Sequence, residues 1–229
     1  MNDPQLSAPP PQRQRFFNSQ PPVVIWLAGL IAVAHVARVF LLPPEEGQAL
    51  GELLAVVPAS FEQHGLDQVN LLALVGHVFV HADFIHLAFN LALMLAASGA
   101  VVRRLGAAGG GSLRFLALFF LSAIASAATF VLVNRGSDVG AVGASGAICG
   151  VFAAYLLGAR WDWRASLRDP NVRNAGLWFL GLNVGLAFVV RQFGIMPIAW
   201  EAHLGGFIAG CVLFPLLAPK LALREENWG

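Results

Sequence analysis

The chain has 229 residues, of which 57% are hydrophobic and only 12% are charged, and its formal net charge is +1. Soluble globular proteins carry about 25% charged residues, so this composition excludes an ordinary soluble domain and a disordered chain. A net charge of +1 also leaves no basic surface for phosphate groups, which excludes a typical nucleic-acid-binding protein. The sequence therefore predicts a multi-pass membrane protein.

Six segments of the sequence are long and apolar enough to cross a bilayer as helices, which takes about 20 residues each. In chain order they cover residues 23–42, 84–102, 113–133, 139–159, 175–190 and 197–218. They predict an all-α fold, a polytopic bundle of six transmembrane helices that occupies residues 23–218. The polar, proline-rich residues 1–22 are expected to form a flexible tail, and residues 219–229 a short second tail.

The connection between the first two predicted spans, residues 43–83, is unusually long. Its apolar piece, residues 69–80, is too short to cross a bilayer. We expect this piece to lie in the membrane interface or to re-enter the protein, where the backbone is surrounded by protein and not by lipid.

The positions of lysine and arginine predict the orientation, because cytoplasmic loops of membrane proteins carry an excess of both. With six spans, eleven of the 14 basic residues fall on the side of the two termini. These eleven residues are Arg13, Arg15, Arg103, Arg104, Arg114, Arg160, Arg164, Arg168, Arg173, Lys220 and Arg224. Both termini are therefore expected in the cytoplasm.

Three clusters of polar and small residues lie near the start of the second, fourth and sixth predicted spans. They are His77, His81, His86 and Asn90; Gly143, Ser145 and Gly146; and His203 with Gly206 and Gly210. Hydrogen-bonding groups inside a span are costly and mark functional sites. Because these three spans all run from outside to inside, we expect the clusters at a similar depth. The other polar residues considered, His35, Arg38 and Asn183, are interpreted as interfacial or inter-helix contacts.

The spacing of glycines predicts which helices touch. The four-residue pairs are Gly146 with Gly150 and Gly206 with Gly210. Each pair presents a small-residue face that lets membrane helices approach closely. Ser145 is adjacent to the first pair, and His203 lies three residues before the second, on the same helical face. Packing of these faces would bring the serine hydroxyl to an imidazole, the base that a serine nucleophile needs. His86 and Asn90, one turn apart, offer donors to an oxyanion.

Other interpretations stay open at this point. A serine between glycines is often only a small packing residue, and the motif is not the soluble hydrolase elbow, because Ala147 stands where that elbow has glycine. His77, His81 and His86 could ligate a metal, but the His-Glu-x-x-His signature of zinc proteases is absent from the sequence. A non-catalytic membrane protein could also use these polar groups to bind client transmembrane helices or solutes.

Together, the three clusters resemble those of the rhomboid family of intramembrane serine proteases. The matching motifs are His81-x-x-x-x-His86-x-x-x-Asn90, Gly143-x-Ser145-Gly146, and Ala202-His203 followed by Gly206 and Gly210. The resemblance extends over about residues 20–218. It implies that Ser145 is the nucleophile and His203 the base. The same resemblance implies that His86 and Asn90 form the oxyanion hole. It also implies a supporting network of His81, Gly143 and Gly146.

This resemblance also implies an activity and a setting. The enzyme would hydrolyse peptide bonds in or near transmembrane segments of other membrane proteins, with no cofactor and no metal. Its partners would be transmembrane protein substrates and the lipid bilayer, and no nucleic acid. A bacterial inner membrane is the expected location, because six spans with short tails suit the simpler bacterial form of the family.

Two features depart from the family pattern. Many relatives have an aromatic residue one helical turn after the serine, packed on the histidine ring, and here that position is Cys149. Many bacterial relatives also have a Trp-Arg pair in the first loop, and residues 43–83 contain neither residue type. The sequence therefore leaves open how His203 is oriented and how the first loop packs.

Overall fold

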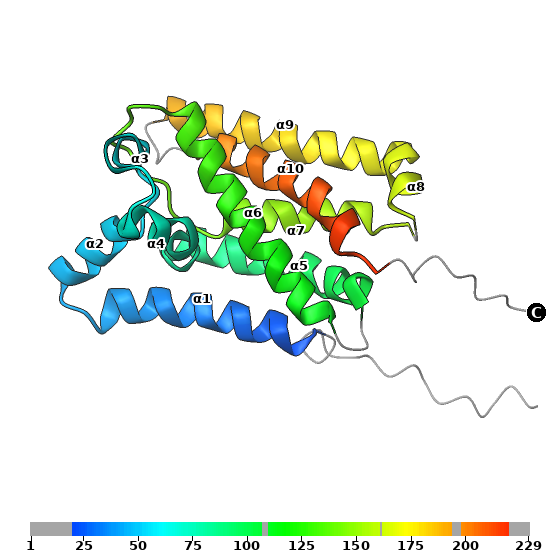
Figure 1. Ribbon diagram of the computed structural model, residues 1–229, viewed down its shortest axis with the longest axis horizontal. Coiled ribbons are helices and arrows are strands. Elements are labelled where there is room, and N and C mark those ends of the chain that lie inside the picture. The colour runs from blue at the N-terminus through cyan, green and yellow to red at the C-terminus, as the bar shows by residue number, and fades with distance from the viewer. Residues whose placement is uncertain (1–19, 107–109, 161, 194–197, 220–229) are drawn as a thin grey trace, which may run out of the picture.

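The computed structural model describes residues 20–106, 110–160, 162–193 and 198–219 (Figure 1). In this part of the chain every element of regular secondary structure is a helix, apart from one isolated β-bridge between Val56 and Ala141. The all-α fold predicted from the sequence is confirmed. The two predicted tails lie outside the described residues, except for residues 20–22 and 219.

Five of the described helices are long and apolar enough to cross a membrane. They are α1 (Pro22–Phe40), α5 (Phe84–Gly106), α6 (Gly111–Val133), α9 (Pro170–Gln192) and α10 (Trp200–Leu217). Large apolar side chains are exposed on the outside of the bundle, for example Trp26 and Trp178, each 78% exposed. Extended apolar surface of this kind is disfavoured in water and suits contact with lipid. The chain is a multi-pass membrane protein.

The fourth predicted span differs from the prediction. Its helix, α7 (Ser145–Leu157), has only 13 residues, fewer than the roughly 20 that cross a bilayer. Residues 139–144 are not helical, because the backbone of Ala141 exchanges two hydrogen bonds of 3.0 Å with Val56 of the first loop. Ten of the 13 residues of α7 are buried. A short helix with a non-helical approach is tolerated here because protein, and not lipid, surrounds it.

Helices α6, α7 and α10 pack most closely, with α1 and α9 at opposite edges of the bundle (Figure 1). The facing glycines of α7 and α10 are Gly146 with Gly206 and Gly150 with Gly210. A Cβ atom on Gly206 or Gly210 would collide with the backbone of the glycine opposite. On its other side α7 meets the Ser126 and Ser122 side chains of α6, which likewise leave no room for a Cβ on the α7 glycines. The packing predicted from the glycine spacing is present.

The first loop folds into short helices. These are α2 (Pro44–Leu53), α3 (Pro58–His64), α4 (Gln68–Gly76) and the 3-10 turn η3 (His77–Phe79). The apolar piece predicted not to cross falls in α4 and η3, and α4 packs on α6. Arg38 of α1 holds the loop by donating from Nη1 to Gly47 O at 3.0 Å and from Nη2 to His81 O at 3.1 Å. An arginine from the first helix therefore ties down a loop that has no arginine of its own.

A second connection, between α7 and α9, contains the short helix α8 (Trp163–Arg168). Arg160 Nε donates to Asp169 Oδ2 at 2.9 Å. This hydrogen bond is the main reason that the pKa of the Asp169 carboxyl lies below its usual value. Both charged groups lie outside the long apolar helices, at the end of α7 that is remote from Ser145.

Candidate active site

Ser145 is the first residue of α7, and His203 lies in the first turn of α10. The serine Oγ and the histidine Nε2 are 2.7 Å apart, although the two residues are 58 positions apart in the chain. Both side chains are partly buried. The distance is short enough for direct proton transfer between a hydroxyl and an imidazole. The two residues that the sequence predicted as nucleophile and base are therefore in hydrogen-bond contact.

The segment that leads to the serine depends on Gly143. Its φ of +115° lies in the region that favours glycine, and a Cβ atom there would lie 2.7 Å from Cε1 of His86. Its backbone N–H donates to His77 O at 2.9 Å. On the other side of the serine, a Cβ atom on Gly146 would collide with the Ser126 side chain of α6, which also lines the pocket beside Ser145. Both predicted supporting glycines thus lie where a side chain would disturb the site.

The start of α7 places backbone N–H groups beside the serine. The first hydrogen bond of the helix runs from Ile148 N to Ala144 O at 3.0 Å, so the N–H groups of Ser145, Gly146 and Ala147 precede it. Such groups have no partner within their own helix, and the helix dipole makes that end favourable for a negative charge. The sequence analysis missed these donors because it began the helix at residue 139.

His86 and Asn90 both lie on α5, one turn apart. The His86 ring contacts the backbone position of Gly143. The backbone N–H of His86 donates to Asp83 Oδ1 at 2.7 Å, which caps the start of the helix. Asn90 is buried, and its Nδ2 donates to His86 O at 2.8 Å. One of the two amide protons of Asn90 is thereby committed to its own helix. His86 is the predicted oxyanion donor that touches the serine-bearing segment directly.

His81 lies in a buried group of aromatic rings. Its ring meets His86 edge-on at 5.1 Å between centroids and His35 of α1 at 5.7 Å. Its backbone N–H donates to Nδ1 of His35 at 3.3 Å, and its carbonyl accepts from Arg38. The sequence analysis treated His35 and Arg38 as ordinary contacts. In the structure both hold the loop that carries His81 against α1.

Asn183 of α9 is the site residue that the sequence analysis missed. Its Oδ1 lies 2.7 Å from Nδ1 of His203, the ring nitrogen that does not face the serine. Its Nδ2 donates to Phe179 O, one turn earlier in α9, at 2.9 Å. The signal in the sequence was an amide within an apolar span, a costly group that marks function more often than an exposed one does.

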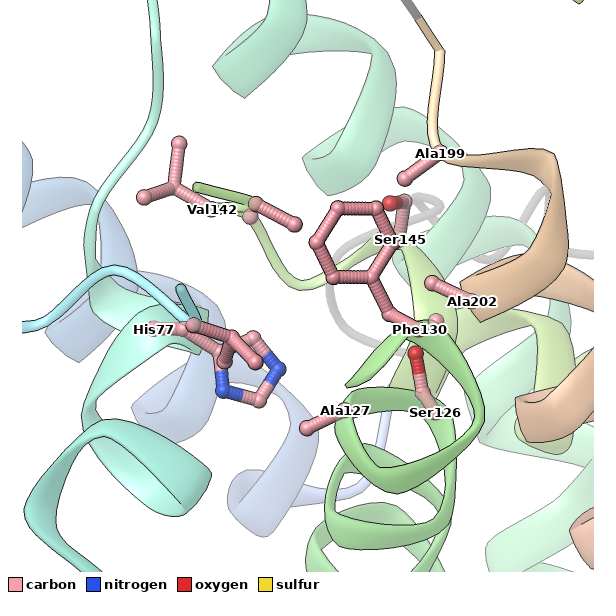
Figure 2. A pocket seen from close by; sticks show the side chains of 12 residues that line it. His77, Ser126, Ala127, Phe130, Val142, Ser145, Ala199 and Ala202 are labelled. Carbon is pink, nitrogen blue, oxygen red and sulfur yellow. The ribbon is translucent and has the colours of Figure 1, made fainter. Parts of the chain in front are cut away.

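A pocket with about 290 Å³ of empty space lies beside Ser145. Its lining comes from η3, α6, the segment before α7, and the starts of α7 and α10. Figure 2 shows His77 on one side of the pocket and Ser145, Ala199 and Ala202 on the other, with the Phe130 ring among them. His77 Nδ1 donates to Ala73 O at 2.8 Å, because a carbonyl can only accept. Its Nε2 is therefore left as an acceptor.

The histidines do not gather as metal ligands would. Among the described residues, no group of three or more His, Cys, Asp or Glu side chains is placed to hold a metal ion. His77 uses one ring nitrogen on a backbone carbonyl. His81 and His86 meet edge to face, an arrangement of rings and not of converging lone pairs.

The amino-acid sequence is similar to a known family and to proteins of that family. The sequence model of the family described as Rhomboid domain matches residues 68–220. RHOMBOID-like protein 5 of Arabidopsis thaliana is 23% identical over an alignment 233 positions long, which covers 90% of this chain and 72% of that protein. Rhomboid-type serine protease 2 of Emericella nidulans is 28% identical over 153 residues, which cover 65% of this chain but only 27% of that protein.

Proposed function

This chain belongs to the rhomboid family, and we propose that it is an intramembrane serine endopeptidase. Its substrates are other membrane proteins, whose peptide bonds it hydrolyses in or near their transmembrane segments. The similarity to a protein named a rhomboid-type serine protease supports this activity. The observation that carries the proposal is the 2.7 Å contact between Ser145 Oγ and His203 Nε2.

In the proposed reaction, Ser145 is the nucleophile and His203 transfers the protons. Ser145 Oγ attacks the carbonyl carbon of the substrate while His203 Nε2 takes the hydroxyl proton, because a serine is a weak nucleophile without a base. The imidazolium then gives that proton to the amine that leaves as the peptide bond breaks. The acyl-serine ester is hydrolysed in the same way, with His203 taking a proton from water and returning it to Ser145.

The negative charge that forms on the carbonyl oxygen needs donors that are already in position. We assign this part to His86 and Asn90 of α5, together with the backbone N–H groups at the start of α7. The support is positional: the His86 ring contacts Gly143, and the α7 N–H groups lie beside the serine and precede the first helical hydrogen bond. His81 acts through His86, whose ring it contacts.

The pocket beside Ser145 limits the shape of the substrate. An α-helix with its side chains is about 10 Å wide and rises about 5.4 Å per turn, so one turn occupies roughly 400 Å³, more than the empty space of about 290 Å³ in the pocket. Because a helix also hides its carbonyl groups in hydrogen bonds, the substrate segment must unwind locally before Ser145 can attack. Water must also reach Ser145, because it hydrolyses the acyl-serine ester.

The proposed setting follows from the helices and the basic residues. The lipid bilayer surrounds the long apolar helices, and the distribution of lysine and arginine supports cytoplasmic termini. A bacterial inner membrane is proposed as the location. The site is proposed to work without a cofactor or a metal, since the dyad itself supplies the nucleophile and the base.

The proposal is tested with purified protein in detergent and a single-span model substrate. The wild type should cleave the substrate and form a covalent adduct with a fluorophosphonate reagent on Ser145. Ser145→Ala should lose both properties. The control is Ser98→Ala, which removes a fully buried hydroxyl of α5 and should keep both. A wild-type protein that binds the substrate but neither cleaves it nor reacts would refute the proposal and favour a non-catalytic protein that binds client helices.

A further inference from the structure

We infer that Asn183 is a positioning residue that orients His203 and fixes which of its ring nitrogens carries the proton. The inference rests on the proposed function, in which His203 is the base. Asn183 is not among the residues that line the pocket, and its hydrogen bond with the site goes to His203 and not to the serine. It acts through His203, so its role is to prepare the base and not to react itself.

Four groups form one continuous chain of hydrogen bonds across three helices. Ser145 of α7 contacts Nε2 of His203 at 2.7 Å, and Nδ1 of His203 contacts Oδ1 of Asn183 at 2.7 Å. Asn183 Nδ2 then donates to the backbone carbonyl of Phe179 at 2.9 Å. The chain therefore starts at the proposed nucleophile and ends at a backbone group whose hydrogen-bonding role cannot change.

That last group determines the direction of every bond in the chain. A carbonyl oxygen only accepts, so the side of the Asn183 amide that faces Phe179 must be its NH₂ group. The side that faces His203 is then the amide oxygen, which also only accepts. Nδ1 of His203 must therefore carry the proton and donate it to Asn183. The neutral imidazole is left with an unprotonated Nε2, the form that accepts the Ser145 proton.

The same bond supports the charged form of the imidazole. When Nε2 takes the serine proton, positive charge spreads to the Nδ1–H group, which points at the oxygen of the Asn183 amide. A fixed dipole with its negative end toward a developing positive charge stabilises the transition state. In the soluble serine protease triad, a carboxylate stabilises the imidazolium with a full negative charge. Asn183 stabilises it with a neutral amide, which is less costly to bury inside an apolar bundle.

A stack of aromatic rings fixes the position of α9 along α10, so that Asn183 lies level with His203. The Phe179 ring, one turn before Asn183, stacks on Phe152 of α7 at 4.3 Å and on Phe207 of α10 at 5.9 Å between centroids. Phe207 in turn lies one turn after His203. Asn183 and His203 are therefore each one turn from the same stack. These ring contacts are important for the position of α9, because only 6% of the most apolar stretch of this helix is buried against the rest of the protein.

Asn183 also explains a departure from the family pattern. Many rhomboid proteases have an aromatic residue one turn after the serine, packed on the histidine ring. Here that residue is Cys149, which is buried in α7 and too small to fill that place. The orientation of His203 comes instead from the opposite side of its ring, through a hydrogen bond to α9.

The test compares Asn183→Leu, which keeps the number of side-chain heavy atoms and the branching but has no acceptor, with Asn183→Asp, which keeps an oxygen toward His203. Asn183→Leu should lower the turnover number about 10- to 100-fold with little change in KM, since a wrongly protonated base slows chemistry and not binding. Asn183→Asp should retain at least about ten times the turnover of Asn183→Leu, because either form of the carboxyl can accept from Nδ1.

The matched control is Asn134→Leu. The Asn134 amide makes the same kind of bond to its own helix, to Phe130 O at 3.0 Å, at the end of α6. Its removal should lower the thermal midpoint about as much as Asn183→Leu does, with turnover kept. A purely structural role for Asn183 would make the two variants alike in both measurements.

The protonation of His203 is measured directly by ¹⁵N NMR of histidine-labelled protein, with the His203 signals assigned by their loss in His203→Gln. The wild type should show the Nδ1–H form, and Asn183→Leu a gain of the Nε2–H form. An Nε2–H form in the wild type, or wild-type turnover and ring signals in Asn183→Leu, would overturn the inference. A wild type that shows the Nδ1–H form but cleaves nothing would refute the proposed protease and leave the positioning role intact.

Discussion

The close contact between α7 and α10 predicts a large effect from the smallest possible substitution, Gly206→Ala. A Cβ atom on Gly206 would lie 2.7 Å from the carbonyl carbon of Gly146 and closer still to its oxygen, whereas ordinary contacts are 3.4–4 Å. The obstructing atoms are backbone atoms of α7, so no side-chain rotation relieves the clash. The two helices must therefore separate by about 1 Å, since packed interiors have little free space to absorb the methyl group.

This separation acts directly on the proposed dyad, because Ser145 and His203 lie on the two helices that part. Their hydrogen bond of 2.7 Å would lengthen beyond the roughly 3.2 Å at which such bonds hold well. A misplacement of about 1 Å at reacting groups can cost roughly 10²-fold in rate. We expect Gly206→Ala to lower turnover about 100-fold and to lower stability by about 1–3 kcal/mol through overpacking.

The assay combines cleavage of a single-span substrate, the rate of fluorophosphonate labelling and the thermal midpoint, all on one preparation. The matched control is Gly29→Ala on α1, where a Cβ would meet nothing within 4 Å. That change should keep turnover and leave stability unchanged or raised by up to about 1 kcal/mol, because alanine restricts the unfolded chain. Wild-type turnover in Gly206→Ala would refute the argument that the α7–α10 distance controls the dyad. Slower cleavage with unchanged labelling would place the defect in substrate binding instead.

Three further expectations concern the oxyanion, the buried cysteine and the orientation. Asn90→Ala should lower turnover roughly 10²–10³-fold and stability by about 1 kcal/mol, since its bond to His86 O is lost; a change in thermal midpoint alone would contradict the oxyanion role. Cys149→Tyr should destabilise the fold by about 1–3 kcal/mol, because the cysteine is only 4% exposed; higher activity at an unchanged midpoint would show that the ring fits. Reporter fusions should lie outside the cell near Gly47 and in the cytoplasm after Arg173, and the opposite pattern would overturn the proposed orientation.

The sequence predicts the long helices well because their signal is local. About 20 apolar residues in a row identify a helix in a bilayer whatever its neighbours are, and α1, α5, α6, α9 and α10 all have this length. The contact between α7 and α10 was also predictable, because glycines four residues apart mark a face that a second helix can approach. From that contact the proximity of Ser145 and His203 followed without any knowledge of the loops.

The start of α7 could not be predicted in the same way. Residues 139–144 contain valine and alanine and continue the apolar run of α7 toward the N-terminus. Their backbone nevertheless forms no helix, because Ala141 pairs with Val56 and Gly143 donates to His77 O. Both partners belong to the first loop, more than 60 residues earlier in the chain. Apolar composition describes how a segment meets lipid, and it carries no information about hydrogen bonds that a distant loop offers to its backbone.

Some residues of the proposed site could likewise be predicted from the sequence, and others only from the tertiary structure. Ser145, His203, His86 and Asn90 stand in motifs of fixed spacing, so the sequence alone determined them as candidates. Asn183 is an isolated amide in α9, and its meaning depends on the position of α9 beside α10, which the stack of Phe179 with Phe152 and Phe207 sets. Only the tertiary structure decided that the Asn183 oxygen meets Nδ1 of His203. A hydrogen bond between two helices depends on how far one is shifted along the other and how each is rotated about its axis. The apolar pattern of a single helix determines neither of these quantities.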